Sequence, residues 1–127
     1  MKTEINIWVV LTILSIHWFA DFVMQTDKEA KGKSKNWDDL LSHTCMYSII
    51  LGIASMFILP MKNIYGFHSF FAFMVITFIC HTITDYFTSR LNSKLWEQGK
   101  VHLFFVSIGF DQLLHFVQLL LTYQLLV

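Results

Sequence analysis

The segment FHSFFAFMVITFICHTITDYF (residues 67–87) decides the fold, because it is long and predominantly apolar. In its second half the only His or charged residues are His81 and Asp85. About 20 such residues are what an α-helix needs to cross a hydrocarbon core of ~30 Å. Three further stretches have the same character, namely residues 5–24, 40–59 and roughly 103–127. The sequence therefore predicts an all-α integral membrane bundle of four transmembrane helices.

The composition supports the same class of protein. Hydrophobic residues make up 55% of the chain and charged residues 14%, against about 25% charged in an average soluble domain. A soluble bundle would need polar faces at helical period, and these segments are apolar nearly all round. The formal net charge is zero, so the basic face that nucleic-acid binding requires is missing. No linker-like stretch divides the chain, which predicts one domain over residues 1–127.

The connections between the spans indicate their orientation. Residues 25–37 and 89–100 are rich in Lys and Arg, whereas residues 60–66 contain only Lys62. The positive-inside rule then places the first and third connections in the cytoplasm and both termini on the other side of a cell (inner) membrane. The first apolar run does not end in a small-residue cleavage site, so we expect no cleaved signal peptide. Residues 90–99 mix Leu and Trp with charges, as either a short interfacial helix or a plain polar loop would.

Ionisable residues inside the spans recur at one spacing. Each span carries, within it or directly at its start, a His and an Asp four residues apart, a spacing that places both on one helix face. His comes first in spans one and three, and Asp comes first in spans two and four. In an antiparallel bundle this order places every Asp nearer the cytoplasm and every His about one turn deeper. The four pairs are His17 with Asp21, Asp39 with His43, His81 with Asp85, and Asp111 with His115.

These pairs predict a divalent-metal site. An Asp inside a membrane helix costs roughly 2.5 to 3.5 kcal/mol on insertion scales, and a bound cation compensates for it. Imidazole nitrogens and carboxylate oxygens suit zinc, iron or manganese. Asp39 is left out because a carboxylate is also favoured at the start of a helix. The predicted ligands outnumber those of one zinc ion, so two ions fit; they are His17, Asp21, His43, His81, Asp85, Asp111 and His115.

Two other interpretations of the pairs stay open, namely structural pairing that fixes helix register and a proton or ion relay. The outer halves of the spans offer almost no ionisable group to complete a relay. If the site is catalytic, Asp21, Asp85 and Asp111 are the candidate acid–base groups. Gln25, Lys31 and Lys35 follow the first pair and could hold a substrate, although solvated positive-inside residues would look the same.

Three stretches carry a resemblance to a known family: HWFADFVMQTDKEAKGKSKNWDDLLSH (17–43), HTITDYF (81–87) and FDQLLHF (110–116). They resemble an uncharacterised family of small bacterial and phage membrane proteins, a domain of unknown function with His-x3-Asp-Phe-x2-Gln, His-x3-Asp and Asp-Gln-x2-His motifs. The resemblance brings no established activity. The motif positions that it implies here are His17, Asp21, Gln25, His43, His81, Asp85, Asp111, Gln112 and His115.

A more distant similarity suggests a chemistry. The arrangement is similar to the LexA-regulated membrane-bound metal-dependent hydrolases and, through them, to the helical zinc phospholipase C group, which cleaves phosphate esters with clustered zinc. The resemblance implies zinc as the metal and hydrolysis as the reaction. We therefore expect a metal-dependent membrane hydrolase acting on a phosphate ester of a lipid, a lipid-linked phosphate or another amphiphile. The alternatives are a metal- or proton-handling transport protein and a structural or interaction protein, for which a homo-oligomer stays open.

Overall fold

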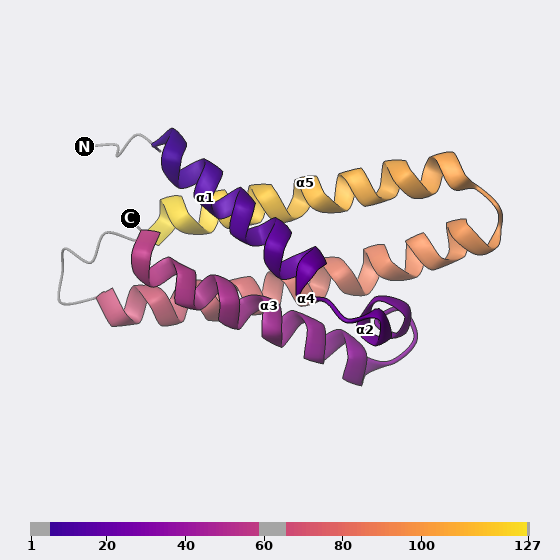
Figure 1. Cartoon of the computed structure of the whole chain (residues 1–127), viewed down its shortest axis with the longest axis horizontal. Coiled ribbons are helices and arrows are strands. Elements are labelled where there is room, and N and C mark those ends of the chain that lie inside the picture. Colours follow the sequence, from indigo (N-terminus) through magenta and orange to yellow (C-terminus); the bar gives the residue numbers. More distant parts are fainter. Residues whose placement is uncertain (1–5, 59–65, 127) are drawn as a thin grey trace.

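The computed structural model describes residues 6–58 and 66–126, and every regular element in these two ranges is helical. The elements are α1 (Ile7–Trp18), the π-helical turn η1 (Phe19–Val23), α2 (Asp27–Gly32), α3 (Trp37–Ile58), α4 (Gly66–Glu97) and α5 (Val101–Leu126). The chain begins with an apolar helical run, α1 and η1, which is followed by the short helix α2 and then by three long helices, α3, α4 and α5 (Figure 1).

The predicted all-α class is confirmed, and three helices are long and apolar enough to cross a membrane. They are Trp37–Ile58, Phe67–Glu97 and Val101–Leu126. The first predicted span is a shorter apolar helix, Ile7–Val23. Residues 5, 59 and 127, where three of the predicted spans begin or end, lie outside the described residues.

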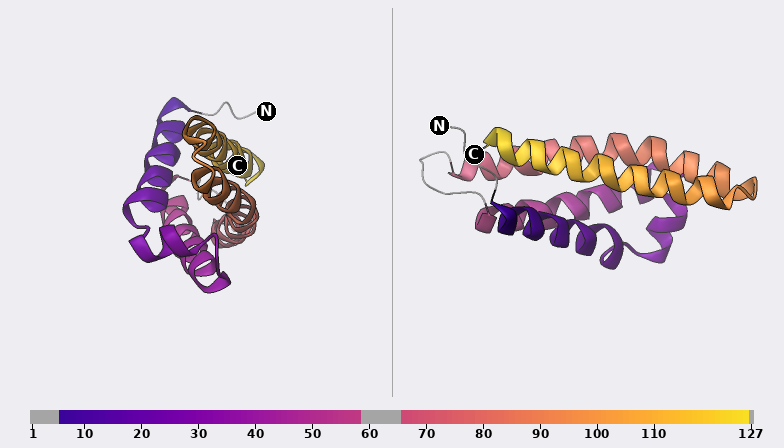
Figure 2. Two further views of the ribbon diagram at one scale, coloured as in Figure 1. Left: turned by 90° about the vertical axis from the view of Figure 1, so that its right-hand side faces the viewer. Right: turned by 90° about the horizontal axis from the view of Figure 1, so that it is seen from above.

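Helices α4 and α5 form a long antiparallel pair that extends beyond the ends of α1 and α3 (Figures 1 and 2). Gly99 joins them with a φ of 67°, a left-handed conformation that glycine adopts at little cost. The expectation of a separate interfacial helix or polar loop over residues 90–99 is wrong, since α4 continues to Glu97. Residues 67–97 contain no Pro or Gly, so nothing breaks the helix before Gly99.

The short helix α2 is held against α3 by its N-terminal cap. Thr26 accepts a hydrogen bond from the Glu29 backbone N–H, and the Glu29 carboxylate accepts from the Thr26 backbone N–H and from Ser42 Oγ. This is a capping box with an added link to the next helix. Burial alone would raise the pKa of Glu29, but the donors of Ser42 and Thr26 outweigh it and hold that pKa below its usual value. The loop that carries the lysines is therefore fixed in place.

The bundle has a mostly apolar outer surface and a polar interior. Large hydrophobic side chains such as Ile53, Phe71 and Leu121 are exposed, as helices that face lipid require. Four histidines and three aspartates are buried together in the half of the bundle nearer α2, where Lys33 at the end of α2 reaches Asp85. The fully buried residues of the other half include the apolar Ile13, Leu51, Phe73 and Leu119 and the hydroxyl-bearing Ser55 and Thr77, none of which is ionisable.

The close approach of α2 to α3 yields a stability test. A Cβ built on Gly32 would overlap the Asp39 carboxylate, whereas a Cβ on Gly109 would meet nothing within 4 Å. We expect Gly32→Ala to destabilise the protein by about 1–3 kcal/mol, the usual cost of overpacking. Gly109→Ala should be neutral or stabilising, because Ala is the better helix former. Thermal unfolding in detergent checks this, and equal melting temperatures for the two variants would contradict it.

Candidate metal centre

The π-helical turn η1 brings Asp21 into the interior. The Met24 backbone N–H bonds the Phe19 carbonyl oxygen at 3.0 Å, one residue further back than in an α-helix. Such π-turns rotate the following side chains and are frequent at functional sites. Asp21 is 5% exposed here, although Phe22 and Val23 beside it face outward.

Four side chains converge next to this turn, from η1, α3 and α4. Asp21, His43, His81 and Asp85 can each offer one ligand atom, all within 4.8 Å of one another, and all four residues are buried. His43 Nε2 lies 3.1 Å from Asp21 Oδ1, 3.3 Å from Asp85 Oδ2 and 3.2 Å from His81 Nε2. His81 Nε2 lies 3.7 Å from Asp21 Oδ1 and 3.6 Å from Asp85 Oδ2.

These separations match a tetrahedral coordination shell. Four ligand atoms held at ~2.0–2.2 Å from zinc would lie about 3.3–3.6 Å from one another. The five measured edges among Asp21, His43, His81 and Asp85 run from 3.1 to 3.7 Å. Two nitrogens and two oxygens from three helical elements thus face one point in a buried space.

A second group shares Asp21 with the first. Asp21, Asp111 and His115 also offer ligand atoms within 4.8 Å of one another. His115 Nε2 lies 3.3 Å from Asp111 Oδ1 and 3.2 Å from Asp85 Oδ1, and Thr88 Oγ1 donates to Asp111 Oδ1 at 2.6 Å. Asp21 belongs to both groups, so it would be a ligand common to two ions if both groups held one.

His17 stands beside the two groups and belongs to neither of them among the described residues. Its Nδ1 is 2.6 Å from the Tyr47 hydroxyl and its Nε2 is 2.8 Å from Gln112 Oε1. Tyr47 in turn stacks on the His81 ring at 3.7 Å between centroids. Gln112 donates to both Asp21 and Asp111. Such contacts orient the ligating side chains around a metal.

Lys33 provides a positive charge at the edge of the cluster. Its Nζ lies 2.8 Å from Asp85 Oδ2, and the side chain is 18% exposed. Burial alone would lower the pKa of Lys33, but the carboxylates of Asp85 and Asp21 outweigh it and raise that pKa above its usual value. The ammonium group is therefore a fixed cation at neutral pH.

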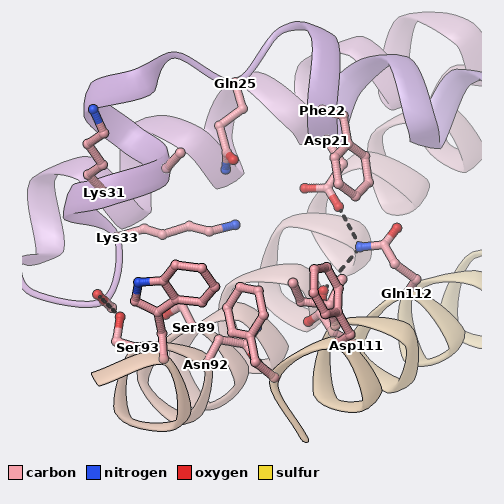
Figure 3. Close-up of a pocket in the computed structure, with 16 residues that line it drawn as sticks. Asp21, Phe22, Gln25, Lys31, Lys33, Ser89, Asn92, Ser93, Asp111 and Gln112 are labelled. Atoms are coloured by element: carbon pink, nitrogen blue, oxygen red, sulfur yellow. Dashed lines mark hydrogen bonds between the residues drawn. The ribbon is translucent and has the colours of Figure 1, made fainter. Parts of the chain in front are cut away.

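The other predicted positions are placed as follows. Gln25 Nε2 lies 3.1 Å from His43 Nδ1, so this residue adjoins the cluster. A cavity adjoins the cluster between α2 and the α4–α5 pair. Lys31 lines this cavity, whereas Lys35 is exposed and lines no part of it. Asp39 lies outside both ligand groups. Its carboxylate accepts a hydrogen bond from Asn36 Nδ2 and lies 3.5 Å from Lys28 Nζ. Figure 3 shows Gln112 between Asp21 and Asp111, with Lys33 reaching in from the opposite side.

Sequence reasoning missed three contributors, which are Tyr47, Lys33 and Thr88. Tyr47 follows His43 by four residues, the spacing that identified the other positions, so this signal was present. Thr88 follows Asp85 by three residues and also lies on the ligand-bearing side of α4. Nothing in the sequence distinguished Lys33 from Lys31 or Lys35, because the choice depends on how the loop turns.

Comparison with known proteins agrees with the motifs. No curated protein and no solved structure matches the chain. One protein family matches over residues 9–127, nearly the whole chain, and the match takes in both ligand groups and the loop that carries Lys33. The chain belongs to the family described as protein of unknown function (DUF3307).

Proposed function

We propose that this protein is a metal-dependent membrane hydrolase that cleaves a phosphate ester of a lipid or another amphiphile. The observation that carries the proposal is the tetrahedral spacing of Asp21, His43, His81 and Asp85 in a buried space. Hydrogen bonds would account for the contacts among these groups one pair at a time, whereas a cation of zinc type would be coordinated by all four ligand atoms at once.

The second group suits a catalytic ion. It offers three ligands, Asp21, Asp111 and His115, and catalytic zinc sites keep a further position open for water or substrate. When bound there, a metal would supply a nucleophilic water at neutral pH and stabilise charge on the phosphate oxygens. The Asp111 side chain is 12% exposed and lines the adjoining cavity. We assign it the role of base, with Asp21 and Asp85 as shared or supporting carboxylates.

The charge balance supports a bound dication. Asp21, Asp85 and Asp111 are buried close together, and Lys33 offsets one of these three negative charges. Two negative charges then remain inside an apolar bundle, where unpaired charge is costly. One divalent ion balances them. The structural alternative balances them with protons on the histidines, and metal analysis separates the two.

The arrangement favours hydrolysis over a relay through the membrane. Ile13, Leu51, Phe73 and Leu119 are fully buried in the half of the bundle away from α2, so the ionisable groups gather at one end. The same end holds the lysine-bearing loop and the turn at Gly99 (Figure 1). We place this end at the cytoplasmic face of the cell membrane, with α1 and η1 together as the fourth span and both termini on the opposite side. The substrate would then arrive from the cytoplasmic leaflet.

Metal content is the first test. We expect protein purified without chelator to contain zinc, up to two ions per chain, and His81→Ala to lose at least one of them. His102→Ala is the matched control, because His102 is exposed at the start of α5. Elemental analysis measures this, and added zinc should raise the melting temperature of the wild type more than that of His81→Ala. A wild type that takes up no metal when zinc is added would refute the proposal.

Turnover is the second test. We expect release of a phosphorylated or dephosphorylated product from a panel of phospholipids and lipid-linked phosphates. Asp111→Asn should lower kcat at least about 100-fold, because it removes both the proposed base and a ligand of the second group, while the ion held by Asp21, His43, His81 and Asp85 is retained. Asp38→Asn is the control, since Asp38 is exposed outside the cluster. Fully metal-loaded protein that turns over no member of the panel would argue against a hydrolase.

Removal of the Lys33 ammonium group tests whether this charge balances the buried carboxylates. We expect Lys33→Met to lower the unfolding free energy of chelator-treated protein by about 3 kcal/mol, the lower end of the cost of breaking a buried ion pair. Lys35→Met should have no measurable effect, because Lys35 is exposed. Chemical unfolding in detergent measures both variants. Equal stabilities would show that Lys33 does not balance the buried carboxylates.

A further inference from the structure

A cavity of about 550 Å³ adjoins the cluster, between α2 and the α4–α5 pair (Figure 3). Its volume lies within the range of small-molecule sites. Asp21, Asp111 and Gln112 form its inner end, so any molecule that fills it touches the second ligand group. The two walls differ in character. The α4 wall is polar, and the α5 wall is formed by Phe104, Phe105 and Ile108.

The polar wall contains two atoms that lack partners. Ser89 Oγ and Asn92 Oδ1 are buried and have no hydrogen-bond partner among the described residues. Leaving such an atom unpaired costs about 1–3 kcal/mol, so buried polar groups are nearly always satisfied. Both side chains line this cavity. In contrast, Ser93 on the same wall already donates to Ser34 at 2.8 Å.

The unpaired atoms follow one helical face away from the cluster. Asp85, Ser89, Asn92 and Trp96 lie at successive three- or four-residue steps of α4, which places them on one side of the helix. Lys33 contacts Asp85 at the inner end of this row. A ligand with its anionic group near Lys33 would therefore extend the rest of its polar head past Ser89 and Asn92.

The chemistry of the wall identifies the groups that it would bind. An amide oxygen only accepts, so Asn92 Oδ1 requires a donor, and a serine hydroxyl can donate or accept. A hydroxyl group or an ammonium group could supply the donor. Lys31 and Lys33 line the cavity and can attract a phosphate, but Asp21 and Asp111 line it too, so charge does not choose between the two donors. A hydroxyl can donate to Asn92 Oδ1 and accept from Ser89 Oγ, whereas an ammonium group can only donate. A hydroxylated headgroup is thus the better fit.

The opposite wall suits an acyl chain. Phe105 of this α5 wall is 62% exposed. Phe104 packs against Trp96, the aromatic residue that ends the α4 row, with ring centroids 5.0 Å apart. These apolar surfaces meet the polar wall at the cavity. A molecule that lies between the two walls must be polar on one side and apolar on the other.

We propose that this cavity binds an amphiphilic phosphate ester whose headgroup carries free hydroxyls, with those hydroxyls on Ser89 and Asn92 and the phosphate toward Lys33. The direction of the phosphate rests on the proposed function, because it brings the ester to Asp111. Hydroxyl recognition by Ser89 and Asn92 needs neither metal nor turnover. The inference therefore names the substrate class and can be tested by binding alone.

The test compares three short-chain lipids on the full chain in detergent by titration calorimetry. Dihexanoyl phosphatidylglycerol and dihexanoyl phosphatidylethanol have the same charge and differ in free hydroxyls, and dihexanoyl phosphatidylethanolamine offers an ammonium group instead. We expect phosphatidylglycerol to bind at least about ten-fold more tightly than either, a difference of ~1.4 kcal/mol. Ser89→Ala with Asn92→Leu should bring its affinity down to that of phosphatidylethanol.

The controls keep the result specific. Ser15→Ala with Gln124→Leu makes the same kinds of substitution at exposed positions outside the cavity, and it should leave the preference unchanged. Melting temperatures establish that each variant is folded. Equal binding of phosphatidylglycerol and phosphatidylethanol would overturn the inference, as would a preference that survives the paired cavity substitutions. Tighter binding of phosphatidylethanolamine would overturn the assignment of hydroxyls.

The outcome separates this inference from the proposed function. Selective binding of phosphatidylglycerol without hydrolysis of any phosphate ester would support the cavity assignment and refute the hydrolase. Hydrolysis that does not distinguish phosphatidylglycerol from phosphatidylethanol would support the hydrolase and refute the hydroxyl site.

Discussion

Three carboxylates buried between apolar helices are the constraint on which this structure depends. Asp21, Asp85 and Asp111 are each at most 8% exposed, and charge in such surroundings must be neutralised nearby. The fold meets this need with histidines from several helices and one lysine from a loop. The positions of these counter-groups explain why an otherwise apolar bundle has one polar end.

The elements around this cluster divide the work of positioning. The π-turn η1 directs Asp21 inward. Tyr47 orients the His17 ring through a hydrogen bond, and Gln112 orients the Asp21 carboxylate in the same way. The capping box of α2 and its bond to Ser42 fix the loop that delivers Lys33. Side chains held in this way lose little freedom when a ligand arrives, which favours tight and specific binding.

The cavity and the cluster form one continuous surface with a gradient of polarity. Carboxylates and an ammonium group stand at the inner end, unpaired neutral polar atoms follow along α4, and aromatic rings line the opposite wall. The proposed ligand, an amphiphilic phosphate ester, would place its phosphate at the inner end, its headgroup hydroxyls along α4 and its acyl chain against the aromatic rings. The proposed substrate class and the proposed chemistry both depend on the length of α4, which continues past α1 and α3 at the end that holds Gly99.

The sequence by itself determined the helical class, the long apolar helices and six clustered His and Asp residues, because apolar length and i,i+4 spacing are local properties. Tertiary structure alone decided that Lys33 rather than Lys35 reaches Asp85, that His17 bonds Tyr47 and Gln112, and that Ser89 and Asn92 line a cavity. Each of these depends on how a loop turns or on which faces of separate helices meet. Distances between residues far apart in the chain are not encoded by any local pattern.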